Sequence, residues 1–403
     1  MAHKIDVSRG ECRGDVSAQF MSRPADERFN DLHALRAQVH EWAERSEAFE
    51  VSPTAIDLDV TEVEVTTESG DRKLVERLGF SAPHIGEFTP TPFGFDSLCS
   101  LAGVPRNFAR AQVEKGGVAL AAANLTWGLA NRDDAVSLYA MDAGKPGSQL
   151  RAITSPKYGR IHDWMVADQL VRVAGSGRGE QRWKSPGCIN WGNMTYDPEA
   201  AAGSTFFASD RDLFCFLCDD RNPIEVGLLA DGSPDLMFRG IIVWNSEVGS
   251  KTFGVSTMLL RGVCCNRNLW GCEDFQTIEV RHNSGAPEKF LEEAAPQLIA
   301  YAEASTATSL TAIGKARAIT FDAKDEERTA QFGLLVDRLG FSRKVAEAIL
   351  ATDPDGHGKA TEPCLSAWDL SQRATAWARE IAYQDERVAA ERKIGGLMKK
   401  LTA

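Results

Sequence analysis

Residues that could hold a phosphate chain gather in one short stretch of the sequence. Residues 151–184 carry seven basic and three acidic side chains, whereas the whole 403-residue chain has a net charge of −12. Within this stretch, Ser155, Lys157, Tyr158 and Arg160 combine a hydroxyl, two cations and an aromatic ring. Single-stranded nucleic acids are commonly held by cations on the backbone and rings on the bases. The alternative is an ordinary solvated turn that caps the following helix.

A second polar segment, Asn245-Ser-Glu-Val-Gly-Ser250, falls between two strand patterns. Asn and Ser side chains bond backbone amides in tight turns, and Gly249 can adopt a positive φ. This segment is therefore either a strong turn alone or a small polar nest that offers amides and hydroxyls to a phosphate. The full set of predicted nucleic-acid contacts is Arg151, Ser155, Lys157, Tyr158, Arg160, Trp183, Lys184, Arg239, Asn245, Ser246, Gly249, Ser250, Arg261 and Asn266.

Metal and catalytic patterns are weaker. Cys215 and Cys218 form one CxxC pair, which could supply half of a zinc site. The pair lies in an apolar strand pattern, where positions i and i+3 point to opposite faces, so buried free thiols are favoured. The sequence has no phosphate-binding GxxxxGK[ST] loop, no HExxH and no GxSxG. We therefore predict no catalytic residue, no metal and no cofactor.

The N-terminal part is expected to be mixed in structure. Residues 1–28 show no apolar period and are interpreted as a flexible arm. Residues 29–130 form a helical and strand region: a helix capped at Asn30 or Asp31, then a half-buried strand over 55–67 with a bulge near Glu62. A helix capped by Asp96 and another begun by Pro105 follow, and their helix–turn–helix shape indicates either simple packing or a DNA reader.

Residues 131–285 are predicted to be a β-rich core, with strands at 134–141, 149–154, 188–196, 204–209, 212–218, 224–229, 238–244 and 251–262. A helix from Ile161 to Val173 interrupts them, and residues 286–403 are helical. Strands segregated from helices indicate an α+β fold: a central antiparallel β-meander with a packed helix, flanked by an N-terminal α/β region and a C-terminal helical region.

Three motifs resemble a known family. They are Arg151…Ser155-x-x-Tyr158, Asn245-Ser-x-x-Gly249-Ser250 and Val263-Cys264-x-Asn266, in that order along the chain. They resemble the phage/plasmid-like family of unknown function, over roughly residues 85–395. This sequence has Glu247-Val248 where the family pattern leads us to expect a His-Asp pair or similar. The resemblance implies an origin on a mobile element and a bacterial cytoplasm, and it supplies no established reaction.

The distribution of apolar and charged residues indicates where the protein is located and what it could bind. No run of apolar residues is long enough to span a membrane, and the N-terminus lacks a secretory pattern, so we expect a cytoplasmic protein of the bacterial host without membrane contact. The acidic balance argues against coating of long duplexes. The favoured hypothesis is a non-catalytic, oligomerising protein that binds or anneals single strands in replication or recombination. The alternatives are a module that modulates host or phage proteins, and an enzyme acting on nucleic acid or nucleotides.

Overall fold

The computed structural model describes residues 27–66, 70–185, 189–190, 195–196, 205–228, 232, 234–261, 267–268, 278–305, 307–325, 327–353, 359–360, 362–379, 381, 390 and 393–395. The predicted arm at residues 1–28 lies outside this part of the chain, apart from its last two residues. The chain has an α+β fold, as the sequence predicts.

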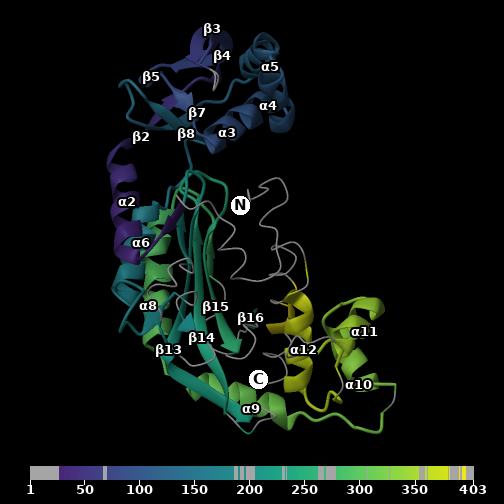
Figure 1. Cartoon of the computed structure of the whole chain (residues 1–403). Helices are drawn as coiled ribbons and strands as arrows, with labels where there is room; N and C mark the ends of the chain where they lie inside the picture. The colour runs from purple at the N-terminus through teal and green to yellow at the C-terminus, as the bar shows by residue number, and fades with distance from the viewer. Residues whose placement is uncertain are drawn as a thin grey trace.

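A large antiparallel sheet forms the centre of the molecule (Figure 1). Its middle is a meander of β12 (Phe206–Ala208), β13 (Leu213–Leu228), β14 (Pro234–Asn245) and β15 (Phe253–Arg261). The two segments predicted at 212–218 and 224–229 are one long strand, β13, with irregular register between Asp219 and Ile224. Short strands complete the sheet: β1 (Arg28–Phe29), β9 (Trp183–Lys184), β16 (Arg267–Asn268) and β17 (Ile278–Val280). Strands β10 (Ile189–Asn190) and β11 (Thr195–Tyr196) pair separately.

Three helices cover one face of this sheet: α2 (Leu32–Glu44), α6 (Asp163–Ala174) and α8 (Ala295–Glu303) (Figure 1). Of the two predicted caps, Asn30 and Asp31, it is Asp31 that caps α2, since its carboxylate accepts the Ala34 N–H at 2.8 Å. The side chains between helices and sheet are almost all apolar, so burial of this layer supplies the main hydrophobic stabilisation.

The N-terminal region has its own core. Strands β2 (Ser46–Val51), β7 (Val136–Met141), β8 (Gln149–Thr154) and β6 (Thr89–Pro90) form a four-stranded sheet. Helices α3 (Pro92–Ala102), α4 (Arg106–Glu114) and α5 (Val118–Ala130) pack with it. β7 pairs with β2 and with β8, so the two predicted strands at 134–141 and 149–154 belong to this sheet and not to the large one. The predicted boundary at residue 130 therefore falls between strands of one sheet.

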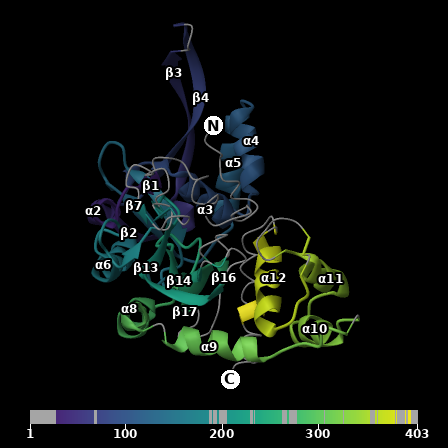
Figure 2. The same cartoon turned by 60° about the horizontal axis from the view of Figure 1, so that its bottom comes forward.

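Two local predictions differ from the structure. The hairpin of β3 (Asp57–Thr66) and β4 (Arg72–Ala82) projects from the molecule (Figure 2), and its register runs without a bulge at Glu62. The apparent slip in the sequence reflects a mostly exposed strand, on which alternation is weakly constrained. Helix α3 begins at Pro92 and is capped by Thr91, because Pro fits the first helical turn better than the predicted start at Asp96. The short elements η3 (Pro53–Ala55) and β5 (Gly86–Glu87) complete this region.

The C-terminal region is helical, as predicted. It contains α7 (Ala286–Lys289), η6 (Phe290–Ala294), α9 (Ala307–Ala318), α10 (Thr329–Phe332), η7 (Gly333–Arg338), α11 (Arg343–Ala351) and α12 (Ala367–Arg379). The last four of these lie together beside the large sheet (Figure 2) and share a core. Within the described residues, no helix has the length and apolarity required to cross a membrane.

Candidate nucleic-acid interface

Four connecting segments meet at one end of the large sheet: residues 155–162, 209–212, 246–252 and 281–285. We call this region the loop end. Segments 209–212 and 246–252 join consecutive strands of the meander, and 281–285 follows β17, which pairs with the start of β15. Segment 155–162 connects β8 to α6 and reaches the same end through hydrogen bonds to the other segments. The topology therefore brings together the two polar segments that the sequence singles out.

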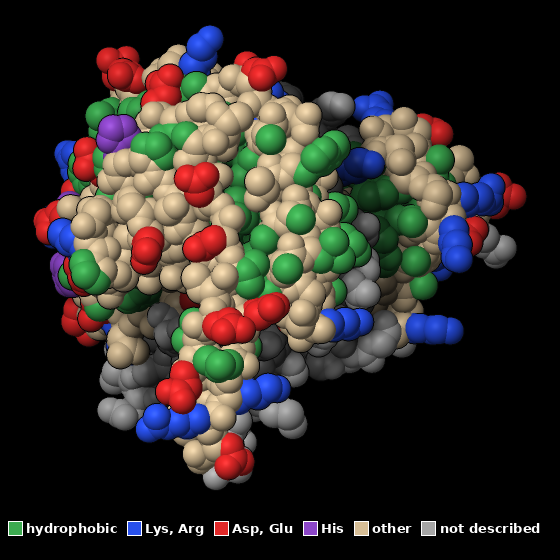
Figure 3. Space-filling model, turned by 90° about the horizontal axis from the view of Figure 1, so that it is seen from above, with side chains coloured by type: hydrophobic (Ala, Val, Ile, Leu, Met, Phe, Trp, Pro, Cys, Tyr) green, Lys and Arg blue, Asp and Glu red, His purple; other side chains and the backbone are tan. Residues whose placement is uncertain are grey.

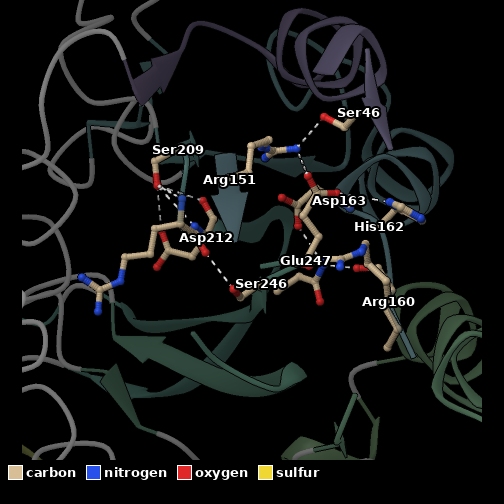
Figure 4. Close-up of polar contacts among 12 residues, drawn as sticks. Ser46, Arg151, Arg160, His162, Asp163, Ser209, Asp212, Ser246 and Glu247 are labelled. Atoms are coloured by element: carbon tan, nitrogen blue, oxygen red, sulfur yellow. Dashed lines mark hydrogen bonds and ion pairs between the residues drawn. The ribbon is translucent and has the colours of Figure 1, made fainter. Parts of the chain in front are cut away.

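Glu247 is the centre of the buried part of the loop end (Figure 4). It is 3% exposed, and one carboxylate oxygen lies 2.5 Å from a guanidinium nitrogen of Arg151, which is also 3% exposed. The other oxygen accepts the backbone N–H of Asp163 at 3.1 Å and lies 3.4 Å from Nδ1 of His162. Because Asp163 opens helix α6 and His162 gives that helix no side-chain cap, Glu247 caps it from the β14–β15 turn.

Electrostatics explain how this carboxylate stays charged. Burial by itself would raise the pKa of Glu247, but Arg151, His162 and the Asp163 N–H lower it to about 2. The pKa of Asp163 shifts in the opposite direction, because burial and the charge of Glu247 raise it well above the usual range. The two buried carboxyls at the start of α6 thus have pKa values shifted in opposite directions.

The predicted turn residues are used inside the fold. Asn245 is fully buried, and its amide donates to Ile161 O at 2.8 Å and to Asp163 Oδ1 at 2.7 Å. The hydroxyls of Ser246 and Ser250 donate to the carbonyl of Arg211 at 2.7 and 3.2 Å. These bonds fasten the β14–β15 turn to the β12–β13 turn and to α6, so strong turn chemistry accounts for these side chains.

Gly249 has a φ of +97° and is exposed, as its place in a tight turn requires. Its Cα faces Tyr158, whose hydroxyl donates to the Ser246 carbonyl at 2.9 Å. The Tyr158 ring stacks on His282 with centroids 4.9 Å apart, and Arg160 lies over its ring. Tyr158 therefore joins segments of the loop end, and its ring already contacts His282 and Arg160. It has no free face on which a base could stack, so the predicted stacking role of Tyr158 is wrong.

Four predicted phosphate or base contacts are interior residues. Arg151 pairs with Glu247, as described above. Arg239 is fully buried and donates to the carbonyls of Tyr301 and Ala304, both at 2.7 Å, at the C-terminal end of α8. Trp183 is 1% exposed and donates to Ala302 O, and Lys184 is 7% exposed. Burial removes these four side chains from any surface that a nucleic acid could reach.

Arg160 is half-buried, and its guanidinium donates to the Glu247 carbonyl and lies 3.8 Å from the ring centroid of Tyr139. Ser155 is exposed and accepts the Lys157 N–H at 3.2 Å. Arg261 ends β15, and its side chain, like the whole of Asn266, falls outside the described residues.

The outer surface of the loop end is cationic. Lys157 and Arg281 are exposed, and Arg211 is partly exposed. In the part of the chain that the structure describes, none of these three forms an ion pair. Lys251 is also present, but it pairs with the buried Asp212 at 3.1 Å. The loop end therefore presents three cations without ion pairs among the described residues, beside the partly exposed carboxylate of Asp210, which accepts the Phe93 N–H at 3.0 Å. Cations held on supported loops can bind phosphate oxygens.

Three residues of the loop end were not predicted from the sequence: the cations Arg211 and Arg281, and the buried Glu247. Arg211 and Arg281 lie outside the basic stretch, and only the strand pairing brings their segments to the same end of the sheet as the segment of Lys157. Glu247 was noticed only as a departure from a family pattern. The sequence does contain one indication of its role, because Glu247 is a single carboxylate that follows the apolar run Ile241–Val243 and two turn residues. A carboxylate buried at such a place needs a cation beside it.

Cys215 and Cys218 are buried, form no disulfide and lie on opposite faces of β13. In the described part of the chain, no three His, Cys, Asp or Glu side chains are grouped closely enough to bind a metal ion. Comparison of the sequence and fold with protein-family models, curated proteins and solved structures finds no match.

Proposed function

We propose that the chain binds the sugar–phosphate backbone of single-stranded nucleic acid at the loop end of its large sheet. The observation that carries this proposal is that Lys157, Arg211 and Arg281 lie on segments that meet at the loop end, where they are exposed or partly exposed and form no ion pair among the described residues. Cations on a preorganised support lose little conformational entropy when they bind a phosphate.

The acidity of the rest of the chain favours a flexible single strand over a duplex. With a net charge of −12, the protein repels an extended polyanion outside the cationic end. A single strand can bend to touch only the loop end, whereas a rigid duplex would bring further phosphates near acidic surfaces. The phage/plasmid resemblance supports a role in replication or recombination of a mobile element, in the cytoplasm of its bacterial host, with strand annealing as the specific form.

The enzyme alternative has little support in the described residues. The two carboxyls with strongly shifted pKa values, Asp163 and Glu247, are 2% and 3% exposed and are engaged by Asn245 and Arg151. Groups enclosed in this way cannot touch a substrate. Their shifted pKa values are explained by their structural role in joining turn and helix.

The proposal is tested by fluorescence anisotropy with a labelled oligothymidylate. The triple variant Lys157→Ala, Arg211→Ala, Arg281→Ala should weaken binding at least tenfold, since phosphate contacts supply most of such affinity (roughly 1 kcal/mol or less each). The matched control is Lys324→Ala, Arg338→Ala, Lys344→Ala, which removes the same charge from exposed sites in the C-terminal region. Equal effects of the two triples would overturn the proposed site, and no binding by the unmodified protein at low salt would overturn the function.

A further inference from the structure

Helix α5 exposes an apolar face. None of its 13 residues is charged, and its buried side, which includes Leu125 and Leu129, packs into the N-terminal core. On the opposite side, Trp127 is 72% exposed and Leu120 is 56% exposed. The exposed positions are Ala119, Leu120, Ala123, Thr126, Trp127 and Ala130. Figure 3 looks down on the part of the molecule that carries this helix and shows hydrophobic side chains across the middle of this view, with several acidic side chains beside them.

The spacing on this face is that of a helix–helix seam. Leu120, Ala123, Trp127 and Ala130 follow one another at intervals of three, four and three residues, which is the a/d repeat of a coiled coil. Large and small side chains alternate along the seam. A face with this pattern can pack against a second helix if the small residues of that helix lie opposite Leu120 and Trp127.

We infer that the occupant of this face is α5 of a second copy of the chain, packed antiparallel about a two-fold axis. The antiparallel register sets Leu120 against Ala130 of the second copy, and Ala123 against its Trp127. Because the axis repeats each contact, every large side chain of the seam then meets a small one. A parallel pairing would instead place Trp127 against Trp127 and leave the alanines facing each other across a gap.

Charges beside the helix select the same orientation. Glu114 and Lys115 lie just before α5, and Arg132, Asp133 and Asp134 lie just after it; all five are exposed and form no ion pair within the described residues. The end after the helix therefore has a net negative charge. The antiparallel register brings Lys115 of each copy to the acidic end of the other. A parallel register would bring like charges together, which costs affinity.

The expected dimer is weak. A helix of this length is about 20 Å long, so its face alone buries less than the roughly 800 Å² per partner of a standard interface. Interfaces of that size are typical of weak association, so we expect a dissociation constant of roughly micromolar magnitude. The self-association is independent of nucleic-acid binding, because α5 contributes no residue to the loop end.

Sedimentation velocity over a concentration series of the full chain tests the inference. The unmodified protein should shift from monomer to dimer, and Trp127→Asp should raise the dissociation constant at least about tenfold, as for a central interface aromatic. The control is Leu310→Asp on α9, a position that is 45% exposed and away from α5, which should leave the dimer unchanged. A monomer at all concentrations, or a dimer indifferent to Trp127→Asp, would overturn the inference.

Exchange of charges tests the orientation separately. Lys115→Glu and Asp134→Lys should each weaken the homodimer. An equimolar mixture of the two variants should associate about as well as the unmodified protein, because each altered charge meets its complement in the other chain. Lys115 and Asp134 flank opposite ends of the helix and do not pair within one chain, so recovery on mixing would have no intramolecular explanation. Failure of the mixture to recover would rule out the antiparallel register.

Discussion

At the scale of single residues, Glu247 joins three parts of the chain. It neutralises Arg151 of the N-terminal sheet, accepts the first N–H of α6 and belongs to the turn between β14 and β15. A buried charge with several partners contributes more to orientation than to net stability, because its desolvation offsets much of the Coulomb energy. Removal of one member, however, leaves the others uncompensated.

We therefore expect Glu247→Gln to lower the free energy of unfolding by about 3–5 kcal/mol, because Arg151 is left buried without its counter-charge. Urea denaturation monitored by tryptophan fluorescence at neutral pH measures the loss. Glu41→Gln is the control: Glu41 pairs with Arg45 on the surface of α2, where an exposed pair is worth about 0.5 kcal/mol or less. Similar losses in the two variants would show that the Glu247 cluster is not a structural centre.

His282 gives the loop end a defined acid sensitivity. Burial lowers its pKa to about 4, with a further contribution from Arg160, although the Gly159 carbonyl opposes the shift. Since the unfolded chain takes up this proton first as the pH falls, the stability linked to His282 is present above pH about 6.5 and is lost by pH about 4.

His282→Phe keeps a flat ring against Tyr158 but cannot titrate. Between pH 6.5 and 4, the unmodified protein should lose about 2 kcal/mol more stability than this variant. Thermal unfolding followed by circular dichroism across this pH range provides the comparison. If the stabilities of the two proteins fell equally between these pH values, His282 would not be the source of the acid sensitivity.

At the scale of elements, the loop end depends on one close backbone approach. Gly159 donates its N–H to the His282 carbonyl, and a Cβ at this position would overlap the carbonyl oxygen of Asn283. Segments 155–162 and 281–285 can therefore meet only if residue 159 is glycine. Lys157 and Arg281 lie on the two segments that this contact holds together.

Gly159→Ala should separate the two segments, lower the unfolding free energy by about 1–3 kcal/mol and weaken oligothymidylate binding. Gly285→Ala is a suitable control, because nothing lies within 4 Å of a Cβ at that position and its φ is −94°. Chemical denaturation and anisotropy on the same preparations measure both effects. Unchanged stability and binding in Gly159→Ala would show that the segments are not held by this approach.

Elements were predictable where a local pattern was strong. The meander, the cap at Asp31 and the turn at Asn245 to Ser250 follow from alternation and turn chemistry, and the structure has all three. The grouping of β7 and β8 with β2 was not predictable, because it depends on pairing across nearly 90 residues. For the same reason, the basic stretch was a poor guide to the surface. Arg151 and Lys184 belong to the same stretch as Lys157, yet both are buried where β8 pairs with β7 and β9 pairs with β13.

At the scale of the whole molecule, charge is distributed unevenly over an acidic protein. The net charge of −12 keeps the chain apart from polyanions, except at the loop end, where cations stand without acidic partners in the described residues. Binding of a single strand at such a site should release few counterions. Its dependence on salt should therefore be measurable but shallow.

The most direct test of this account is the salt dependence of oligothymidylate affinity between about 50 and 200 mM, the range in which phosphate contacts are revealed. With three cations engaged, the logarithm of the binding constant should fall with the logarithm of salt at a slope of about −2, and each of Lys157→Ala, Arg211→Ala and Arg281→Ala should reduce that slope by about 0.7. A slope that is unchanged in all three variants, or binding that does not respond to salt, would contradict the assignment of the loop end as the nucleic-acid interface.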